Sequence, residues 1–401
     1  MISIDANYLK WDFCLIPFFK KMLEYDCNEQ RGMNMVKKYE RIKHDISEKI
    51  LSEVYQVNDK LPTESELMEI FDVSRATVRR AIDELEKENF VYRIQGAGIF
   101  VNDWKNKPQP ELKNKTIGLI STHIADYIFP QIITGIDNYI SQYGYSILIT
   151  DTQNNPEKER KSLTNLLSNN LSGLIIEPTR SARGNANKSI YDNIESMEIP
   201  MLFINAVYDD LDIPYLIMDD VKTGEIATNY LISRGHKKII GIFKVDDKQG
   251  MHRMNGFIKA YQEHPDISNM GDIMMYQTEE NINSLFKKLH SHLKQTKHFV
   301  PTAIVCYNDK LAIQVINFIT EIGLRVPEDI SVIGVDDYQF SRFIHPGLTT
   351  IRHPQEKMGL EAGKMIIDLI NKQPVTSKMY EPELIERESV RKLDEPMHST
   401  E

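Results

Sequence analysis

Polar side chains follow several β-rich runs of the sequence, each at the point where the run ends. They include Glu177 and Asn205 in the middle of the chain, and Asn308 and Asp336 further on. A carboxylate accepts hydrogen bonds, an amide both accepts and donates them, and an arginine such as Arg253 adds planar donors. Together with an aromatic side chain, such groups suit the hydroxyls and the apolar face of a sugar.

Each of these strand-end residues also has a simpler explanation. An Asp or Asn after a strand is often the N-cap of the next helix, and we expect this role for Asp309. For any single residue the two explanations stay open. Several polar residues at successive strand ends favour a binding site.

A second set of candidate residues lies near the start of the chain, where Arg75, Thr77, Arg79 and Arg80 fall within six positions. Arginine pairs with the O6 and N7 atoms of guanine, and threonine can contact a base edge or a phosphate. The alternative is a solvated helix face whose arginines are balanced by the acidic residues that follow. The surrounding elements decide between these interpretations.

Three helices are predicted around these arginines. Apolar residues recur at helical spacing over residues 38–54, which predicts a helix with one buried stripe that includes Val54. Thr63 and Glu66 form a capping box that starts a second helix, whose apolar face includes Ile70. Ser74 is the expected N-cap of a third helix, which carries the arginines.

A small β-hairpin is predicted after the third helix. Residues 90–94 and 98–101 are β-rich and flank Gln95 and Gly96. Two helices joined by a short turn, the second presenting arginines at its N-terminal end, can enter the major groove of DNA. A wing with a glycine at its tip lets Gln95 approach the minor groove or the sugar-phosphate backbone.

Residues 61–67, 73–81 and 95–101 resemble the GntR family of bacterial regulators. The resemblance implies that the residues matching Arg75, Thr77, Arg79, Gln95 and Gly96 contact operator DNA. Many members have Arg where this sequence has Ser65, so a DNA contact there is lost or is replaced by Glu64, which could accept from a cytosine amino group. We also include Arg80 and Lys38, since the positive charge of this region is local to the third helix and to the start of the first.

A polar segment with two prolines, residues 103–114, is the predicted linker. Beyond it, β-rich runs alternate with helical patterns, which implies parallel sheets covered on both faces. Roughly 275 residues exceed what one sheet usually carries, so we expect two lobes with a cleft. The expected strands are 116–122, 146–150, 173–177, 201–205, 238–243, 302–307 and 331–335, and the expected helices are 129–143, 156–170, 221–234, 250–263, 281–293 and 310–322.

Residues 115 to about 390 resemble the LacI/GalR regulators and the related periplasmic sugar-binding proteins, which assigns residues 115–401 to one sugar-binding and dimerisation domain. The motifs that carry the resemblance include residues 115–120, 173–177, 253–257, 306–309 and 326–337. It implies an α/β fold of two lobes, each a parallel sheet flanked by helices, behind the small winged helix-turn-helix domain of residues 35–102. The implied effector contacts are Glu177, Asn205, Arg253, Asn308 and Asp336, with Tyr127 and Phe129 in the first strand–helix loop and His353 as a weaker candidate.

The pairing of a GntR-type head with a LacI/GalR-type body resembles the family of arabinose operon repressors. This resemblance implies a cytoplasmic homodimer that binds palindromic double-stranded operator DNA and is released when L-arabinose occupies the cleft. Residue chemistry alone does not separate L-arabinose from another small sugar, so a regulator that responds to a different sugar stays open. No cofactor, metal or membrane partner is expected.

Overall composition excludes several classes of protein. The chain has 401 residues, three cysteines and a net charge of −10, and no apolar run approaches the roughly 20 residues of a membrane helix. The acidic balance does not argue against DNA, because residues 37–101 carry 11 basic and 13 acidic residues with the arginines concentrated on one helix. Residues 1–34 are interpreted as an uncertain extension, either a disordered or loosely packed segment or a stretch ahead of a true start at Met33 or Met35.

Two other functional classes were weighed. Parallel α/β folds host many enzymes, but we find no GxxxxGK[ST], HExxH or GxSxG motif and predict no catalytic residue. His236 and Cys306 are interpreted as structural residues. The second class is a secreted sugar-binding protein. We find no credible signal peptide for it, and it would leave the head unexplained.

Overall fold

The computed structural model describes residues 38–94, 97–104, 115–124, 127–294 and 300–393. The chain divides into two compact units, Met1–Pro108 and Gln109–Glu401, which we call the head and the body. The division lies inside the predicted linker. Among the described residues, no helix is both long and apolar enough to cross a membrane.

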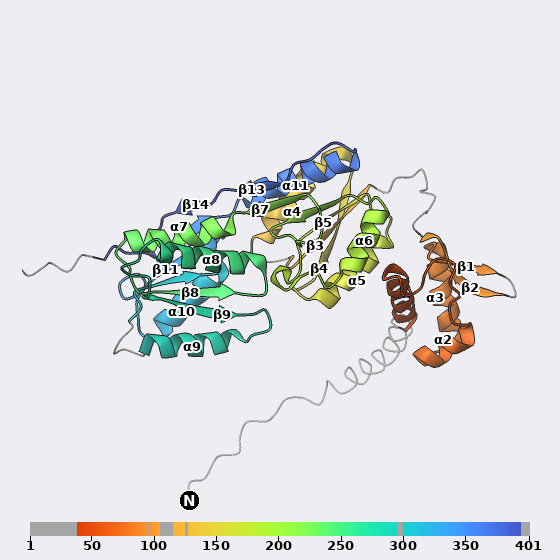
Figure 1. Cartoon of the computed structure of the whole chain (residues 1–401), viewed down its shortest axis with the longest axis horizontal. Coiled ribbons are helices and arrows are strands. Elements are labelled where there is room, and N and C mark those ends of the chain that lie inside the picture. Colours follow the sequence, from red (N-terminus) through yellow and green to blue (C-terminus); the bar gives the residue numbers. More distant parts are fainter. Residues whose placement is uncertain (1–37, 95–96, 105–114, 125–126, 295–299, 394–401) are drawn as a thin grey trace, which may run out of the picture. The chain divides into compact units, whose positions relative to one another are not determined.

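The described residues of the head form three helices and one hairpin (Figure 1). A first helix over residues 38–51 is followed by α2 (Glu64–Phe71) and α3 (Arg75–Lys87). Strands β1 (Val91–Ile94) and β2 (Gly98–Val101) pair antiparallel. The predicted winged arrangement is therefore confirmed, while its tip at Gln95 and Gly96 lies outside the described residues.

Local signals in the sequence account for where these helices begin. The Thr63 hydroxyl accepts from the Glu66 amide and the Glu66 carboxylate accepts from the Thr63 amide, so the predicted capping box is present. Ser74 caps α3 as predicted. Two predicted core residues are wrong: Val54 is 65% exposed because the first helix ends before it, and Ile70 is 62% exposed because α2 buries only Leu67.

The body contains two lobes, each built on one sheet of six strands. Lobe 1 has the strand order β13-β7-β6-β5-β3-β4, and all its strands are parallel. Its elements are β3 (Thr116–Ser121), α4 (Phe129–Ile140), β4 (Ser146–Asp151), α5 (Pro156–Leu167), β5 (Gly173–Ile176), α6 (Lys188–Ser196), β6 (Met201–Ile204), β7 (Tyr215–Met218), α11 (Gln355–Ile370) and β13 (Lys378–Tyr380), with short 3-10 turns at Ser141–Tyr143 and Ser181–Arg183.

Lobe 2 has the strand order β14-β12-β11-β10-β8-β9, with only β14 antiparallel to its neighbour. Its elements are α7 (Asp220–Ser233), β8 (Ile239–Lys244), α8 (Lys248–Gln262), β9 (Gly271–Tyr276), α9 (Ile282–Lys294), β10 (Ala303–Cys306), α10 (Asp309–Glu321), β11 (Ser331–Asp336), β12 (Thr349–Arg352) and β14 (Glu383–Ile385).

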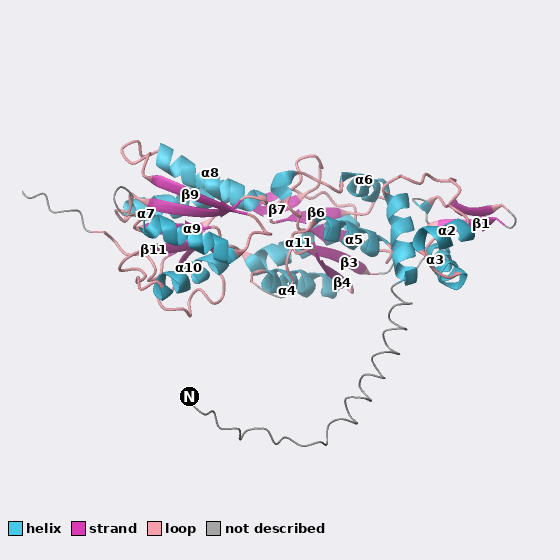
Figure 2. Cartoon of the chain, turned by 90° about the horizontal axis from the view of Figure 1, so that it is seen from below, coloured by secondary structure: helices cyan, strands magenta, loops and turns pink. Residues whose placement is uncertain are grey.

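Helices cover both faces of each sheet (Figures 1 and 2). In lobe 1, α4 and α11 pack their apolar residues on one face of the sheet. In lobe 2, α9 and α10 cover one face, and α7 and α8 cover the other. The central strands β3, β5, β6, β8, β10 and β11 are therefore buried on both sides, as expected for parallel sheets, while the edge strands such as β4 and β9 are partly exposed.

The chain passes between the lobes three times, and the sequence did not predict this. The crossovers follow β7, β12 and β13, at residues 219, 353–354 and 381–382. We did not predict α6, α11, β7, β9, β12, β13 or β14. Most of the missed strands are only three or four residues long, too short for a clear period-2 pattern.

Candidate functional site

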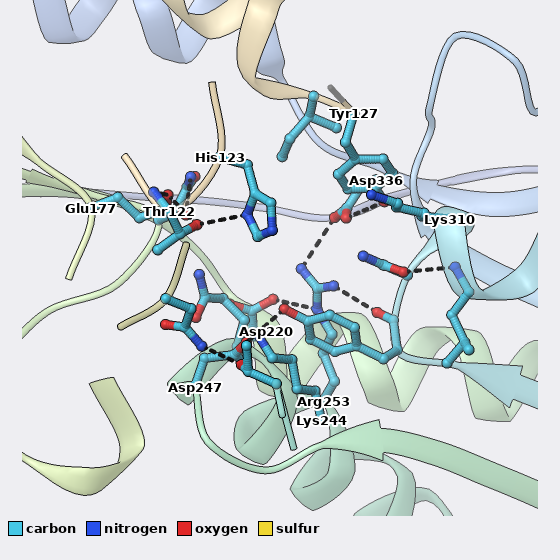
Figure 3. A pocket seen from close by; sticks show the side chains of 18 of the residues that line it. Thr122, His123, Tyr127, Glu177, Asp220, Lys244, Asp247, Arg253, Lys310 and Asp336 are labelled. Atoms are coloured by element: carbon cyan, nitrogen blue, oxygen red, sulfur yellow. Dashed lines mark hydrogen bonds and ion pairs between the residues drawn. The ribbon is translucent and has the colours of Figure 1, made fainter. Parts of the chain in front are cut away.

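A pocket of about 340 Å³ lies between the two lobes, at the carboxyl ends of the strands (Figure 3). Both lobes contribute side chains to it. All eight residues predicted for the cleft line this one pocket: Tyr127, Phe129, Glu177, Asn205, Arg253, Asn308, Asp336 and His353. The parallel topology explains the convergence, because successive strands end at the same edge of a sheet.

Arg253 is bonded to three other groups of the pocket wall. It extends from α8, and its guanidinium donates to Asp220 at 2.7 Å, to Asp336 at 3.2 Å and to the carbonyl of Tyr307 at 2.7 Å. Arg253 is only 4% exposed. Burial alone would lower its pKa, but Asp336 and Asp220 outweigh burial and hold the pKa well above its ordinary value. The arginine is therefore a fixed cation with two buried counter-ions.

Asp220 is a pocket residue that the sequence reasoning missed. It is the first residue of α7, at the first crossover between the lobes, and burial raises the pKa of its carboxyl to about 7 although Arg253 opposes the shift. The residue follows β7, a strand of four residues that we did not predict. With that strand recognised, the strand-end pattern would have included Asp220.

Tyr127 connects the lobes across the pocket. Its hydroxyl donates to Asp336 at 2.5 Å and accepts from the Asp309 amide at 3.2 Å, both in lobe 2 (Figure 3). Its backbone has a φ of 66°, a conformation that is uncommon for a residue other than glycine. Phe129, predicted in the same loop, is instead the first residue of α4, where its ring stacks on His123.

The expected capping role of Asp309 is wrong. Asn308 is the N-cap of α10 and accepts from the Leu311 amide. Asp309 is fully buried and accepts from Thr350, Ser341 and the Tyr338 amide, while burial raises its pKa to about 8. The capping role therefore belongs to Asn308, which also lines the pocket as predicted.

Further polar residues complete the wall of the pocket. Lys244 at the end of β8 pairs with Asp247 at 3.0 Å, and Asp247 is also the N-cap of α8. Thr122 and His123 follow β3 directly. The strand-end rule that gave the other candidates could have found these as well. Additional lining residues include Asn154, Gln249, Tyr276, Thr278, Glu280, Tyr307 and Lys310.

Two residues set aside as structural have structural surroundings. His236 is buried and bonds Thr302 and the Arg391 carbonyl, and burial lowers its pKa to about 4. Cys306 lies in β10, where burial raises the pKa of its thiol. Within the described ranges, no group of three or more His, Cys, Asp or Glu side chains is placed to hold a metal ion.

In the head, Glu64 joins two of the three exposed arginines of α3. Its carboxylate accepts from Arg75 Nε at 2.9 Å and from Arg79 Nε at 3.1 Å. The hydrogen bond from Arg75 is the main cause of a lowered pKa for Glu64. Glu64 therefore holds Arg75 and Arg79 as a pair through their Nε atoms.

The other predicted DNA contacts of the head occupy separate positions. Arg80 lies with its guanidinium 4.1 Å from the ring centre of Tyr39, on the first helix. The Thr77 hydroxyl lies 2.9 Å from the Ser74 hydroxyl at the start of α3. Lys38 and Ser65 are exposed. Gln95 and Gly96 lie outside the described residues.

The chain matches two known domain families. Residues 38–101 match the family described as bacterial regulatory proteins, gntR family. Residues 228–390 match the periplasmic binding protein-like domain. These matches correspond to the head and to the larger part of the body.

Solved structures share the fold of the body. A LacI family transcriptional regulator from Enterococcus faecium, with bound ribose, superposes with a TM-score of 0.61 at 21% identity over 70% of this chain and all of that one. The transcription regulator CcpA of Lactococcus lactis gives a TM-score of 0.60 at 23% identity, over 69% of this chain and 99% of that one. At this level of identity the comparison establishes the two-lobed architecture.

Two relatives extend the similarity to nearly the whole chain. The arabinose metabolism transcriptional repressor of Geobacillus stearothermophilus is 41% identical over 359 residues, 89% of this chain and 98% of that protein. The protein of the same name from Halalkalibacterium halodurans is 43% identical over 364 residues, 88% of this chain and 97% of the relative. Transcriptional repressors are non-enzymatic regulators. With its GntR-type head, its LacI-like body and this degree of identity, the chain belongs to the family of arabinose metabolism transcriptional repressors.

Proposed function

We propose that this chain is a cytoplasmic homodimeric repressor that binds a palindromic operator through its two heads and is released when L-arabinose enters the pocket. The observation that carries the proposal is the convergence of carboxylates, amides, Arg253 and aromatic rings on one pocket between two lobes. Such groups pair with sugar hydroxyls, each of which donates and accepts. The relatives named as arabinose metabolism repressors support L-arabinose over other sugars.

The arrangement in the head supports contact with the major groove of DNA. Arg75 and Arg79 are exposed on α3, and Glu64 orients both. We propose that their terminal nitrogens read bases or phosphates, with Thr77 and Ser65 nearby and with Lys38 and Arg80 contributing charge. The head carries few cations, so a single head binds weakly and specific binding requires two. Gln95 and Gly96 of the wing are proposed to contact the adjacent groove.

Exposed apolar side chains on both lobes support pairing with a second copy of the chain. Single exposed apolar residues are common on protein surfaces, but a contiguous apolar patch marks an interaction surface, and these residues are our candidates for one. The residues are Tyr143 and Leu148 in lobe 1, and Phe340 and Phe343 in lobe 2. Sedimentation velocity of the full chain is expected to give a dimer, and a monomer at micromolar concentration would contradict this part of the proposal.

Footprinting on operator DNA tests the assignment of the head. Arg79→Ala is expected to weaken operator binding by about 1–3 kcal/mol, because a bidentate contact to a base is lost. Lys87→Ala is the matched control, since Lys87 is exposed at the other end of the same helix and pairs with Glu84. An unchanged footprint for Arg79→Ala would refute the role of this arginine.

The effector is tested by thermal unfolding of the full chain in L-arabinose, D-xylose, D-ribose and D-galactose. A ligand that binds only the native state raises the stability by RT ln(1 + [L]/Kd). We expect L-arabinose to raise the melting temperature most and to release operator DNA at the same concentrations. A larger increase in melting temperature with another sugar would contradict L-arabinose as the effector, while the proposed role as a sugar-responsive repressor would stand.

A further inference from the structure

Two histidines line the pocket, and each is connected through one intermediate side chain to the same buried carboxylate. His123 bonds Thr122, and Thr122 bonds Glu177 (Figure 3). His353 bonds Asn205, and Asn205 also bonds Glu177. The protonation pattern of both rings therefore depends on which atoms donate at Glu177.

Glu177 accepts at both of its oxygens. Oε2 receives the Thr122 amide at 2.8 Å and the Thr122 hydroxyl at 2.7 Å, and Oε1 receives the Asn205 Nδ2 at 3.1 Å. The side chain is 4% exposed. Oε2 also receives the Ser121 hydroxyl at 3.3 Å. Four donors converging on one carboxyl group are the pattern of an ionised carboxylate, which can only accept.

The path through Asn205 fixes the hydrogen of His353. Because Asn205 directs Nδ2 at Glu177, its Oδ1 faces His353 Nε2 at 3.1 Å. Two acceptors do not bond each other, so Nε2 carries the hydrogen. Burial lowers the pKa of His353 to about 4, so the ring is neutral at pH 7 and its Nδ1 is an acceptor. This Nδ1 is buried and has no hydrogen-bond partner among the residues that the structure describes.

The path through Thr122 fixes His123 in the same way. Thr122 has a single hydroxyl hydrogen, which it donates to Glu177, so its oxygen accepts from His123 Nδ1 at 3.2 Å. In the neutral ring Nε2 is then an acceptor. The ring stacks on Phe129 and projects into the pocket, with Nε2 on the side away from Thr122 (Figure 3).

We propose that Glu177 holds both histidines as hydrogen-bond acceptors toward the effector, so that this part of the pocket selects ligands that donate hydroxyl hydrogens. Glu177 is then a positioning residue, and the two rings are the groups that meet the ligand. The inference rests on the proposed sugar-binding function. It adds that the two histidines accept hydrogen bonds from the ligand rather than donate them. His353 lies in the segment between β12 and α11, where the chain crosses from lobe 2 to lobe 1. A hydroxyl bound to His353 therefore contacts one of the connections between the lobes.

The tautomers can be measured without any ligand. Long-range proton–nitrogen NMR of the full chain, with labelled histidine, distinguishes a ring nitrogen that carries hydrogen from one that does not. We expect hydrogen on Nδ1 of His123 and on Nε2 of His353. The opposite tautomer at either ring would overturn the proposal for that ring, whatever sugar the protein binds.

Glu177→Gln tests whether Glu177 sets the tautomers of His123 and His353. The glutamine has nearly the same shape but presents both a donor and an acceptor, so at least one of the two tautomers is expected to reverse. If both tautomers are unchanged in a variant that still melts cooperatively, Glu177 does not set them. If the variant does not fold, the spectrum of the unmodified chain still decides between the tautomers.

Titration with L-arabinose tests the contact to the ligand. His353→Gln keeps a donor for Asn205 but has no acceptor at the place of Nδ1, and we expect it to weaken binding about 10- to 100-fold. His292→Gln is the control and is expected to change binding less than twofold, because His292 on α9 pairs with Asp272 on β9 and does not line the pocket. Unchanged affinity in His353→Gln would overturn the assignment of Nδ1.

The two proposals fail in different ways. If the unmodified chain binds none of the sugars, the proposed function and the selectivity for sugar hydroxyls both fail. The NMR spectrum then still shows whether Glu177 fixes the two tautomers through Thr122 and Asn205. If the chain binds L-arabinose but either ring has the opposite tautomer, the function stands and the inference falls.

Discussion

Arg253 and His236 illustrate how burial changes what a charged or titratable residue does in this fold. Arg253 keeps its charge because two carboxylates and a carbonyl surround it. His236 has no charged partner, and its two ring nitrogens bond a hydroxyl and a carbonyl. The first environment stabilises a buried charge, and the second excludes one.

The depressed pKa of His236 makes stability depend on pH. The unfolded chain protonates this imidazole below about pH 6.5, but the folded chain does so only near its pKa of about 4. The unfolded state therefore binds more protons in this window, and the free energy of unfolding falls as the pH falls, by about 2 kcal/mol at pH 5 from this residue. Asp220 and Asp309, whose pKa values are raised, act in the opposite direction over the same range.

A variant isolates the contribution of His236. Urea unfolding at pH 7.5 and pH 5.0 gives a difference in free energy for each protein. In His236→Gln, the free energy of unfolding no longer contains the decrease between pH 7.5 and pH 5.0 that is due to His236. The contributions of Asp220 and Asp309 are expected to stay the same. Equal differences in the two proteins would show that His236 does not titrate as assigned.

At the scale of elements, the packing of α7 against α8 decides where Arg253 points. The two helices approach closely at Gly224 and Gly256. A Cβ on Gly256 would clash with the carbonyl oxygen of Val221 and with the Glu225 amide. Backbone atoms cannot move aside as a flexible side chain can, so a side chain at this position displaces α8 and Arg253, which lies one turn earlier.

Gly256→Ala is therefore expected to lower the free energy of unfolding by about 1–3 kcal/mol, as overpacking does elsewhere. The neighbouring Asn255→Ala is the matched control, because Asn255 is exposed on the same helix and alanine is a better helix former. Chemical denaturation of both variants measures the two effects. A Gly256→Ala protein as stable as the control would mean that the helices can separate without cost.

At the scale of the whole body, side chains join the lobes on two sides of the pocket. On one side, Tyr127 reaches Asp336 and the Asp309 amide. On the other, Asn154 Nδ2 donates to Thr278 at 2.6 Å, and Arg180 forms an ion pair with Glu279 while its amide donates to Asn154. We expect these contacts to hold the lobes together around a ligand.

The ion pair between Arg180 and Glu279 is expected to slow the escape of sugar. Glu279 is 63% exposed, so water screens the pair and its contribution is below about 1 kcal/mol. Arg180→Gln and Glu279→Gln are each expected to raise the dissociation rate of L-arabinose two- to fivefold. The double variant should add little beyond either one, because both remove the same pair. Additive effects in stopped-flow release would contradict a direct coupling.

Much of this fold follows from local sequence. The capping box at Thr63, the N-cap at Ser74 and the alternation of β-rich and helical patterns predict most of the elements without any long-range information. The strand-end pattern pointed to Glu177, Asn205, Asn308 and Asp336, because parallel strands end at a common edge, whereas His353 and Phe129 came from the family resemblance. The exposure of Val54 and Ile70 and the burial of Asp309 could not be predicted in this way, since they depend on contacts outside the segments of these residues.

The sequence by itself determined the two-part organisation, the winged head, the α/β body and the strand-end residues that surround the pocket. Only the tertiary structure decided that Glu64 orients Arg75 and Arg79, that Asp220 shares Arg253 with Asp336, and that Glu177 connects to both His123 and His353. The physical reason is the range of the interactions. Caps and periodic patterns act over three or four residues, whereas these pairs are brought together by crossovers and helix packing between distant segments.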